Sequence, residues 1–376
     1  MRIRDQKCAV AAAMALFLLF SGCGKQDKGT SVPRSVVSVN YTYTEEGFFC
    51  KDNKINRLEY FDYGQRSYFP VCSRPNCGHD TEECTAVSLD RKAVCVGQLG
   101  EKLYYLHPED RESGAFYSCD MDGGSVQKAA DFSKMPNSMY GTVIVFQDDH
   151  CFLAAGYDQF DEETHEFLGV TSALYSVDLK GGETKALLPE RTERLPAYVL
   201  YGLYERSLLF AEWNGEEFLL KVMDLDTGGI TMPFGEFAVS KSGRLEGEQF
   251  VCGVNEEGAE KVKELNLETG EILEIAQMDL LDVYWKEGLK ILIDSEERTW
   301  QYTEDGEIRL IREGEENRFI PFGGKGELLV GTRNYQDLLY MEKEDFLAGK
   351  NNWIVVAEAR KDWAALTPGS PHPSAG

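Results

Sequence analysis

The sequence contains YSCDMDGG at residues 117–124 and YSVDLKGG at residues 175–182. The two segments share Tyr, Ser, Asp and both glycines in register. Each is typical of a strand that ends in a tight turn, because glycine supplies the positive φ that such a turn needs. Related turns occur as DLDTG at 224–228 and NLETG at 266–270, and Tyr63-Gly64 and Asp305-Gly306 hold corresponding places. The chain therefore repeats one strand–turn–strand unit.

A second marker of this unit is a short apolar strand that recurs about every 47 residues. This spacing is typical of β-propeller blades. The seven occurrences are Phe48-Phe49, Leu103 to Tyr105, Cys151 to Leu153, Leu208 to Phe210, Phe250-Val251, Leu289 to Ile293 and Leu328 to Val330.

Convincing helices are scarce, with one short helical excursion expected at residues 341–350. A ring of sheets covers its own faces and edges, which isolated units of this size cannot do. We therefore predict an all-β fold, a β-propeller of four-stranded antiparallel blades with seven blades favoured. Six or eight blades, and a pair of β-sandwich domains, remain as alternatives.

The charge balance argues against one class of partner. The 376 residues include 39 Lys and Arg against 64 Asp and Glu, for a formal net charge of -25. A phosphate backbone would repel such a chain, so no nucleic acid is expected as a partner.

The N-terminus has the features of an export signal. Basic residues precede an apolar run over residues 8–20, which is too short for a spanning helix and ends just before Cys23. The segment Phe20-Ser21-Gly22-Cys23 resembles the lipobox of bacterial lipoproteins, with Phe20 where that family usually has Leu, Val or Ile. This resemblance implies cleavage before Cys23 and a covalent diacylglycerol on its sulfur.

The predicted organisation follows from this signal. Residues 1–22 form the lipoprotein signal peptide, 23–35 a lipid-anchored tether, 36–360 the β-propeller and 361–376 a polar C-terminal tail. Because two acyl chains anchor stably, we expect the protein on the outer, extracytoplasmic face of the bacterial cell membrane.

One insertion, residues 72–86, concentrates metal-ligand chemistry. Cys72, Cys77, His79 and Cys84 follow the spacing C-x4-C-x-H-x4-C, and a Cys3His set is a standard tetrahedral ligand set for structural zinc. A disulfide among the three cysteines and reduced, unliganded thiols are the alternatives. All four ligands of a closed site are present, which disfavours catalytic zinc.

Taken together, the lipobox, the repeats and this insertion resemble β-propeller-like surface lipoproteins of Gram-positive anaerobic bacteria, which carry a similar Cys, Cys-x-His, Cys insertion. The resemblance implies a shared role for the insertion but names no activity.

The other cysteines of the mature chain lie in apolar strand contexts and are predicted to pack in the core. They are Cys50, Cys95, Cys119, Cys151 and Cys252. The acidic insertion from Asp158 to Leu168 lacks the spacing of a calcium loop, so we interpret it as a solvated loop that extends one rim.

Two functions remain open. The first is a lipid-anchored binding or scaffold module that recognises a surface protein, peptide or glycan through the propeller rim. The alternative is a propeller enzyme that hydrolyses or eliminates glycans with rim carboxylates. The sequence favours the first, because it identifies no catalytic residues. An exposed aromatic patch would support binding, whereas a deep central pocket would support the enzyme.

Overall fold

The computed structural model describes residues 35–38, 41–52, 57–72, 74–109, 113–132, 138–139, 144–161, 163–239, 242–313, 319–333 and 337–356. All of them belong to one compact unit, Pro33–Gly376. The signal peptide, Cys23, nearly all of the tether and the C-terminal tail lie outside the described residues. No described helix is long and apolar enough to cross a bilayer.

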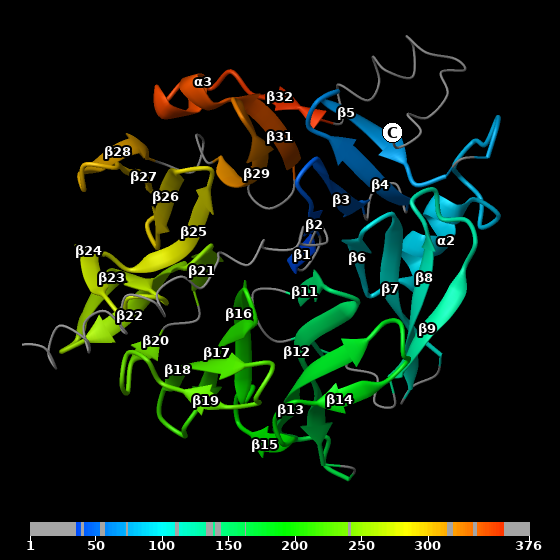
Figure 1. Ribbon diagram of the computed structural model, residues 1–376. Helices are drawn as coiled ribbons and strands as arrows, with labels where there is room; N and C mark the ends of the chain where they lie inside the picture. The colour runs from blue at the N-terminus through cyan, green and yellow to red at the C-terminus, as the bar shows by residue number, and fades with distance from the viewer. Residues whose placement is uncertain are drawn as a thin grey trace, which may run out of the picture. The chain divides into compact units, whose positions relative to one another are not determined.

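The described strands form seven antiparallel blades of four strands, arranged in a ring (Figure 1). Within a blade the chain runs from the innermost strand to the outermost and then enters the next blade. This confirms the predicted seven-bladed β-propeller, and the alternatives of six blades, eight blades or two sandwiches are wrong.

The strands of blades 1 to 3 follow one another along the chain. They are β2 (Tyr41–Tyr43), β3 (Gly47–Asp52), β4 (Arg57–Asp62) and β5 (Ser67–Pro70); β6 (Cys95–Leu99), β7 (Lys102–Pro108), β8 (Gly114–Asp120) and β9 (Gln127–Phe132); β11 (Ile144–Gln147), β12 (His150–Phe160), β13 (Phe167–Asp178) and β14 (Thr184–Ala186).

Blades 4 to 7 repeat this order. They are β16 (Tyr198–Tyr204), β17 (Ser207–Trp213), β18 (Phe218–Asp224) and β19 (Ile230–Thr231); β21 (Gly243–Glu246), β22 (Gln249–Glu256), β23 (Ala259–Asn266) and β24 (Ile272–Ala276); β25 (Leu280–Lys286), β26 (Leu289–Asp294), β27 (Thr299–Tyr302) and β28 (Ile308–Arg312); β29 (Ile320–Lys325), β30 (Leu328–Arg333), β31 (Asp337–Glu342) and β32 (Ile354–Val355). Short strands β10 (Ser138–Met139), β15 (Arg191–Glu193) and β20 (Ala238–Val239) pair with β12, β13 and β18.

The seven apolar segments found in the sequence all fall in the second strand of a blade. In blade 4, for example, Leu208, Leu209 and Phe210 are fully buried. A second strand is flanked by strands of its own blade and covered on both faces by the adjacent blades, so both sets of alternating side chains are apolar. This burial explains why the second strand carries the clearest sequence signal.

The repeated turns join the third strand of a blade to the fourth. The Asp224 carboxylate accepts hydrogen bonds from the Asp226 and Thr227 N–H groups at 3.0 and 2.7 Å. Gly228 has a φ of 71°, in the left-handed region. These contacts confirm the turn interpretation. In blade 7 the helix α3 (Lys343–Leu347) occupies this place, within the predicted range 341–350.

Hydrophobic cores lie between neighbouring blades. Seven clusters of buried residues correspond to the seven junctions of the ring. The last junction joins Phe48 and Phe61 of blade 1 to Leu328 and Val330 of blade 7. No described strand is exchanged between these two blades, so side-chain packing closes the ring.

The first described strand, β1 (Ser35–Ser38), belongs to no single blade. It pairs with β2, the innermost strand of blade 1, and with β11, the innermost strand of blade 3. Val36 pairs with Tyr43 on one side and with Val145 on the other. The chain therefore enters the propeller along the inner strands.

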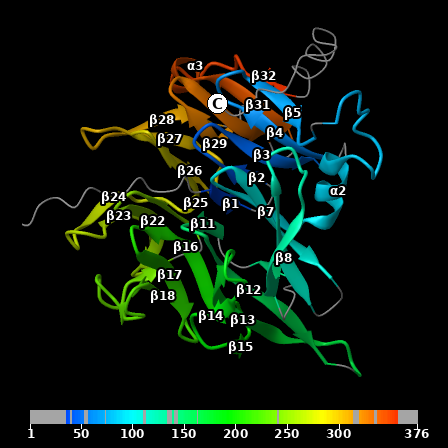
Figure 2. The same cartoon turned by 45° about the vertical axis from the view of Figure 1, so that its right-hand side comes forward.

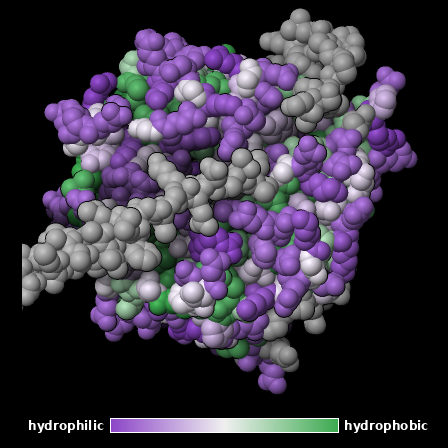
Figure 3. Space-filling view, viewed as in Figure 1, coloured by the Kyte–Doolittle hydropathy of each residue, from purple (hydrophilic) through white to green (hydrophobic). Residues whose placement is uncertain are grey.

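The side chains of Cys50, Cys95, Cys119, Cys151 and Cys252 are buried, as expected for core residues. The face in Figure 3 is mostly hydrophilic between small apolar areas, in agreement with the high content of charged residues.

Candidate metal centre

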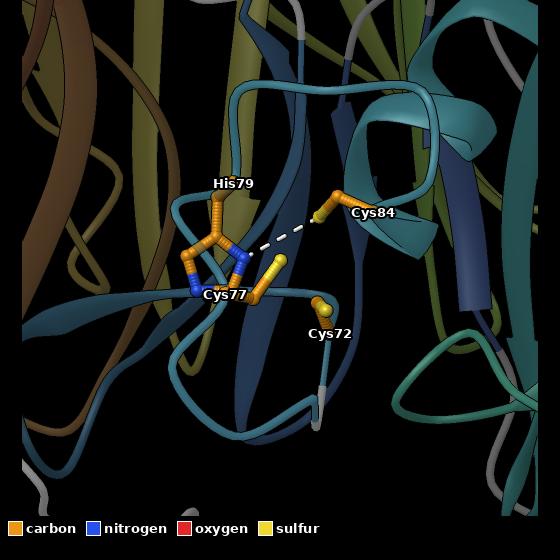
Figure 4. Close-up of side chains that lie close together, drawn as sticks. All are labelled: Cys72, Cys77, His79 and Cys84. Carbon is orange, nitrogen blue, oxygen red and sulfur yellow. Dashed lines mark hydrogen bonds between the residues drawn. The ribbon is translucent and has the colours of Figure 1, made fainter.

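The loop from Cys72 to Cys84 brings its three thiols and one imidazole together. Cys72 follows β5, Cys84 precedes α2 (Thr85–Lys92), and Cys77 and His79 lie on the loop between them. Asn76 and His79 adopt the left-handed conformation, with φ of 58° and 53°. These two positions reverse the chain within a few residues, so that four ligands of one short loop can face one another. Figure 4 shows the four side chains directed into the same small space.

The distances fit a four-coordinate ion. One ligand atom from each of Cys72, Cys77, His79 and Cys84 lies within 4.8 Å of the others, and Nδ1 of His79 is 3.4 Å from Sγ of Cys84. Tetrahedral zinc with Zn–S bonds of about 2.3 Å places its ligand atoms roughly 3.5–3.8 Å apart. The distance between His79 and Cys84 is close to this spacing. Ligand atoms as far as 4.8 Å apart would need to move about 1 Å closer to each other. The cluster can therefore bind a metal such as zinc.

The helix N-terminus favours negative charge at this cluster. Cys84 is the N-cap of α2, and the backbone amides of Ala86 and Val87 in the first turn act to lower the pKa of its thiol. Thiolates are the metal-binding form of cysteine, and they are stabilised by the amides and dipole of a helix N-terminus.

Burial and hydrogen bonds act in opposite directions on two of the thiols. Burial raises the pKa of Cys72. Hydrogen bonds with the Arg74 backbone, Thr85 and Cys84 lower it by more than burial raises it, so its pKa lies below the ordinary value. Burial, together with hydrogen bonds to Cys72 and Cys77, raises the pKa of Cys84. Deprotonation is therefore easier at Cys72 than at Cys84, and a bound cation would favour the thiolate form of each cysteine.

Helix α2 makes the cluster part of the ring. Ala86, Val87 and Leu89 pack between blade 1 and blade 2, against Leu58 and Leu103 among others. Figure 2 shows α2 at the outer side of these blades. Cys72 and Cys84 are themselves 1% and 0% exposed within the same core. A metal ion at this position would hold both ends of the inserted loop against the junction of blades 1 and 2.

The sequence analysis identified the four ligands but missed the helix that follows them. The signal was present, because Ala86, Leu89 and Ala93 recur at helical spacing directly after Cys84. The insertion predicted from the sequence ends at Ala86. Helix α2 extends the structured insertion to Lys92.

The acidic insertion of blade 3 is held by local turn contacts. The Asp161 carboxylate accepts hydrogen bonds from the N–H groups of Glu163 and Thr164 at 3.0 and 2.7 Å. The insertion predicted as a loop over residues 158–168 is therefore a hairpin extension, because residues 158–160 and 167–168 belong to strands β12 and β13 and only the acidic turn between them is a loop. The predicted lipidation site, Cys23, lies outside the described residues.

One groove opens between blades 5 and 6, and a second opens between blades 6 and 7. Each has a volume of about 470 Å³. In the groove between blades 5 and 6, the Lys290 ammonium lies 4.0 Å from the centre of the Trp285 ring and 2.9 Å from a carboxylate oxygen of Glu264. Glu246 and Tyr302 also line this groove.

Comparisons with known proteins identify the fold. An oligogalacturonate lyase from Vibrio parahaemolyticus is 10% identical, with a TM-score of 0.52 over 82% of this chain and 92% of that chain. The computationally designed Ika8 protein is 9% identical, with a TM-score of 0.49 over 87% and 88%. Dipeptidyl peptidase 4 from Porphyromonas gingivalis is 8% identical, with a TM-score of 0.48 over 90% and 61%. At these identities the likeness concerns the fold alone. No family model matches the sequence, and no curated protein matches it.

Proposed function

We propose that this protein is a lipid-anchored binding or scaffold module on the outer face of the bacterial cell membrane. Its seven blades form a rigid support, and the diacylglycerol on Cys23 holds that support at the membrane. Cys72, Cys77, His79 and Cys84 bind a structural zinc ion, which supplies cross-linking between the two ends of the inserted loop.

The observation that carries the binding role is an exposed aromatic hairpin tip. Strands β12 and β13 are the longest in the described chain and project beyond the neighbouring blades (Figure 2). At their tip Phe160, Phe167 and Leu168 are 52%, 50% and 62% exposed. The two phenylalanine rings lie edge to face, with centroids 5.8 Å apart.

Such a tip is expected at a contact surface. Clustered exposed aromatic side chains are unfavourable in water, and they become the buried centre of an interface when a partner covers them. The hairpin is held by eleven registered residue pairs, so little conformational entropy is lost on binding. We name this surface, formed by Phe160, Phe167 and Leu168, the hairpin tip.

The charges around the hairpin tip define the partner further. Asp161 closes the turn, and Glu163 and Glu166 are exposed beside it. An apolar patch with an acidic border is complementary to an apolar groove with a basic border. We therefore propose an extracytoplasmic protein with a basic surface as the partner.

Photo-cross-linking on intact cells tests this function. A benzophenone amino acid replaces Leu168 in one variant and Val126, which is 53% exposed on blade 2, in a matched control. The expected result is a discrete protein adduct from position 168 alone. It should disappear when Phe160 and Phe167 are both changed to Ser and weaken when Glu163 and Glu166 are changed to Gln. Equal adducts from both positions, or none from 168, would contradict the proposed surface.

A further inference from the structure

A second cluster of polar side chains lies at the inner strands of the ring, away from the hairpin tip. Arg244 belongs to β21, Tyr284 and Lys286 belong to β25, and Tyr63 follows β4. The Lys286 ammonium lies 5.3 Å from the centre of the Tyr63 ring. Arg244 is close enough to Tyr63, Tyr284 and Lys286 to affect the pKa of each. We call these four residues the arginine–lysine cluster.

Two polar atoms of this cluster are buried and incompletely paired. Nε of Arg244 has no hydrogen-bond partner among the described residues, and the Tyr63 hydroxyl has only the Gly324 N–H near it, which leaves its own O–H without an acceptor. Tyr63 is only 3% exposed. Leaving a buried donor unsatisfied is costly, so native structures usually supply a partner from protein, water or ligand.

The two cations of the cluster also lack ion pairs. Neither Arg244 nor Lys286 forms an ion pair with a carboxylate among the described residues, whereas Lys290 and Lys325 each form one. Burial lowers the pKa of Lys286, which agrees with an ammonium group that is poorly solvated and has no close counter-ion. The guanidinium and the ammonium offer only donors, and the tyrosine hydroxyl can donate as well, so a carboxylate is the acceptor that suits all three.

The surroundings of the cluster contain hydrogen-bond acceptors as well. Glu246 and Glu287 are near enough to Lys286 to act on its pKa. Glu246 also lines the groove of about 470 Å³ between blades 5 and 6. These glutamates would repel a dianion such as phosphate more strongly than a singly charged carboxylate, and hydroxyl groups of the same ligand would donate to them. The volume of the groove is within the range of small-ligand sites.

From these contacts we propose that the arginine–lysine cluster binds the carboxylate of an acidic sugar. Arg244, Lys286 and the Tyr63 hydroxyl hold the carboxylate, and Glu246 accepts from the sugar hydroxyls in the adjoining groove. A neutral sugar would leave the two cations without an acceptor. The site is separate from the hairpin tip, which belongs to blade 3.

Gly323 keeps space for the Tyr63 hydroxyl. A Cβ atom at Gly323 would lie 2.5 Å from that oxygen, closer than any normal contact. Gly323→Ala would therefore displace the Tyr63 ring without removing a charged group. This variant therefore tests the position of the Tyr63 hydroxyl while the charge of the cluster stays the same.

Isothermal titration of the purified protein tests the proposal. The probes are D-glucuronate, D-galacturonate and N-acetylmuramate, each beside its neutral counterpart D-glucose, D-galactose or N-acetylglucosamine. We expect at least one acidic sugar to bind about tenfold or more tightly than its neutral counterpart. Binding of none of the acidic sugars, or equal binding of the neutral ones, would overturn the proposal.

Variants assign the binding to this cluster. Tyr63→Phe and Lys286→Met should each weaken binding by about tenfold or more, and Gly323→Ala should weaken it as well. Lys261→Met, on the outer part of blade 5, should leave it unchanged. Tyr63→Phe should change the melting temperature little, because the hydroxyl has no partner to lose except the Gly324 N–H. Full binding by Tyr63→Phe or by Lys286→Met would contradict the assigned roles. Replacing Phe160 and Phe167 should not affect the titration, so the two surfaces are tested independently.

Discussion

Arg66 of blade 1 forms an ion pair with Glu342 of blade 7, with Nη1 and Oε1 2.5 Å apart. The pair spans the junction at which the two ends of the propeller meet. Both side chains are more than 40% exposed, so water and salt weaken their attraction. Beneath them lies the buried core formed by Phe48, Phe61 and Val330. The ring is therefore closed by apolar packing, and the ion pair contributes little.

Two substitutions separate these contributions to ring closure. Phe48→Ala should lower the free energy of unfolding by about 3–5 kcal/mol, because it removes a fully buried ring. Arg66→Ala should lower it by about 1 kcal/mol or less. Chemical denaturation of both variants measures the difference. Comparable losses would contradict closure by packing.

Metal content and a free-thiol count of protein purified without chelator test the zinc site. We expect about one zinc per chain, lost in Cys77→Ser and retained in Cys252→Ala, whose thiol is buried between blades 4 and 5. Because structural zinc contributes to folding free energy, chelation should lower the melting temperature by about 5 °C or more in the wild type but not in Cys77→Ser. Absence of metal with two thiols missing would instead indicate a disulfide.

Acid should destabilise blade 6 through Asp294. Its side chain is 2% exposed, and Oδ2 accepts hydrogen bonds from Trp300 at 2.9 Å and Arg298 at 2.7 Å. Burial raises the pKa of Asp294, but the hydrogen bonds from Trp300 and Arg298 outweigh it and the pKa lies below the ordinary value.

A folded-state pKa below the unfolded value stabilises the protein at pH values above about 4, and this stabilisation is lost as the pH falls toward the folded-state pKa. Asp294→Asn should therefore cost about 1–3 kcal/mol at pH 7 and progressively less below pH 4. Unfolding curves of both proteins between pH 7 and pH 3 measure this convergence. A difference that stayed constant with pH would contradict the role of the ionised carboxylate.

The lipid anchor is tested by Cys23→Ala. The wild type should fractionate with membranes and carry the mass of a diacylglycerol, whereas the variant should remain unprocessed or be released, because it lacks the sulfur that forms the thioether. Membrane fractionation and intact mass provide the measurement. The same fraction and mass for both proteins would contradict lipidation at this residue.

The sequence by itself determined the all-β propeller class and favoured seven blades, whereas only the closed ring in the structure decided between six, seven and eight. The second strand of each blade is apolar on both faces, because adjacent blades cover it, and the turn after the third strand needs Gly at positive φ, as at Gly228. Both constraints are local, so they are visible as repeats. The ligand set Cys72, Cys77, His79 and Cys84 was visible for the same reason, since all four lie on one short loop.

Tertiary structure alone decided how distant segments meet. Strand β1 pairs with blades 1 and 3, helix α2 fills the junction of blades 1 and 2, and Tyr63 approaches Lys286 from the opposite end of the chain. Arg244, Tyr284 and Lys286 have no distinctive spacing in the sequence. Their proximity to Tyr63 arises only when the packing of blade 7 against blade 1 closes the ring, because a closed ring makes neighbours of residues that no local pattern relates.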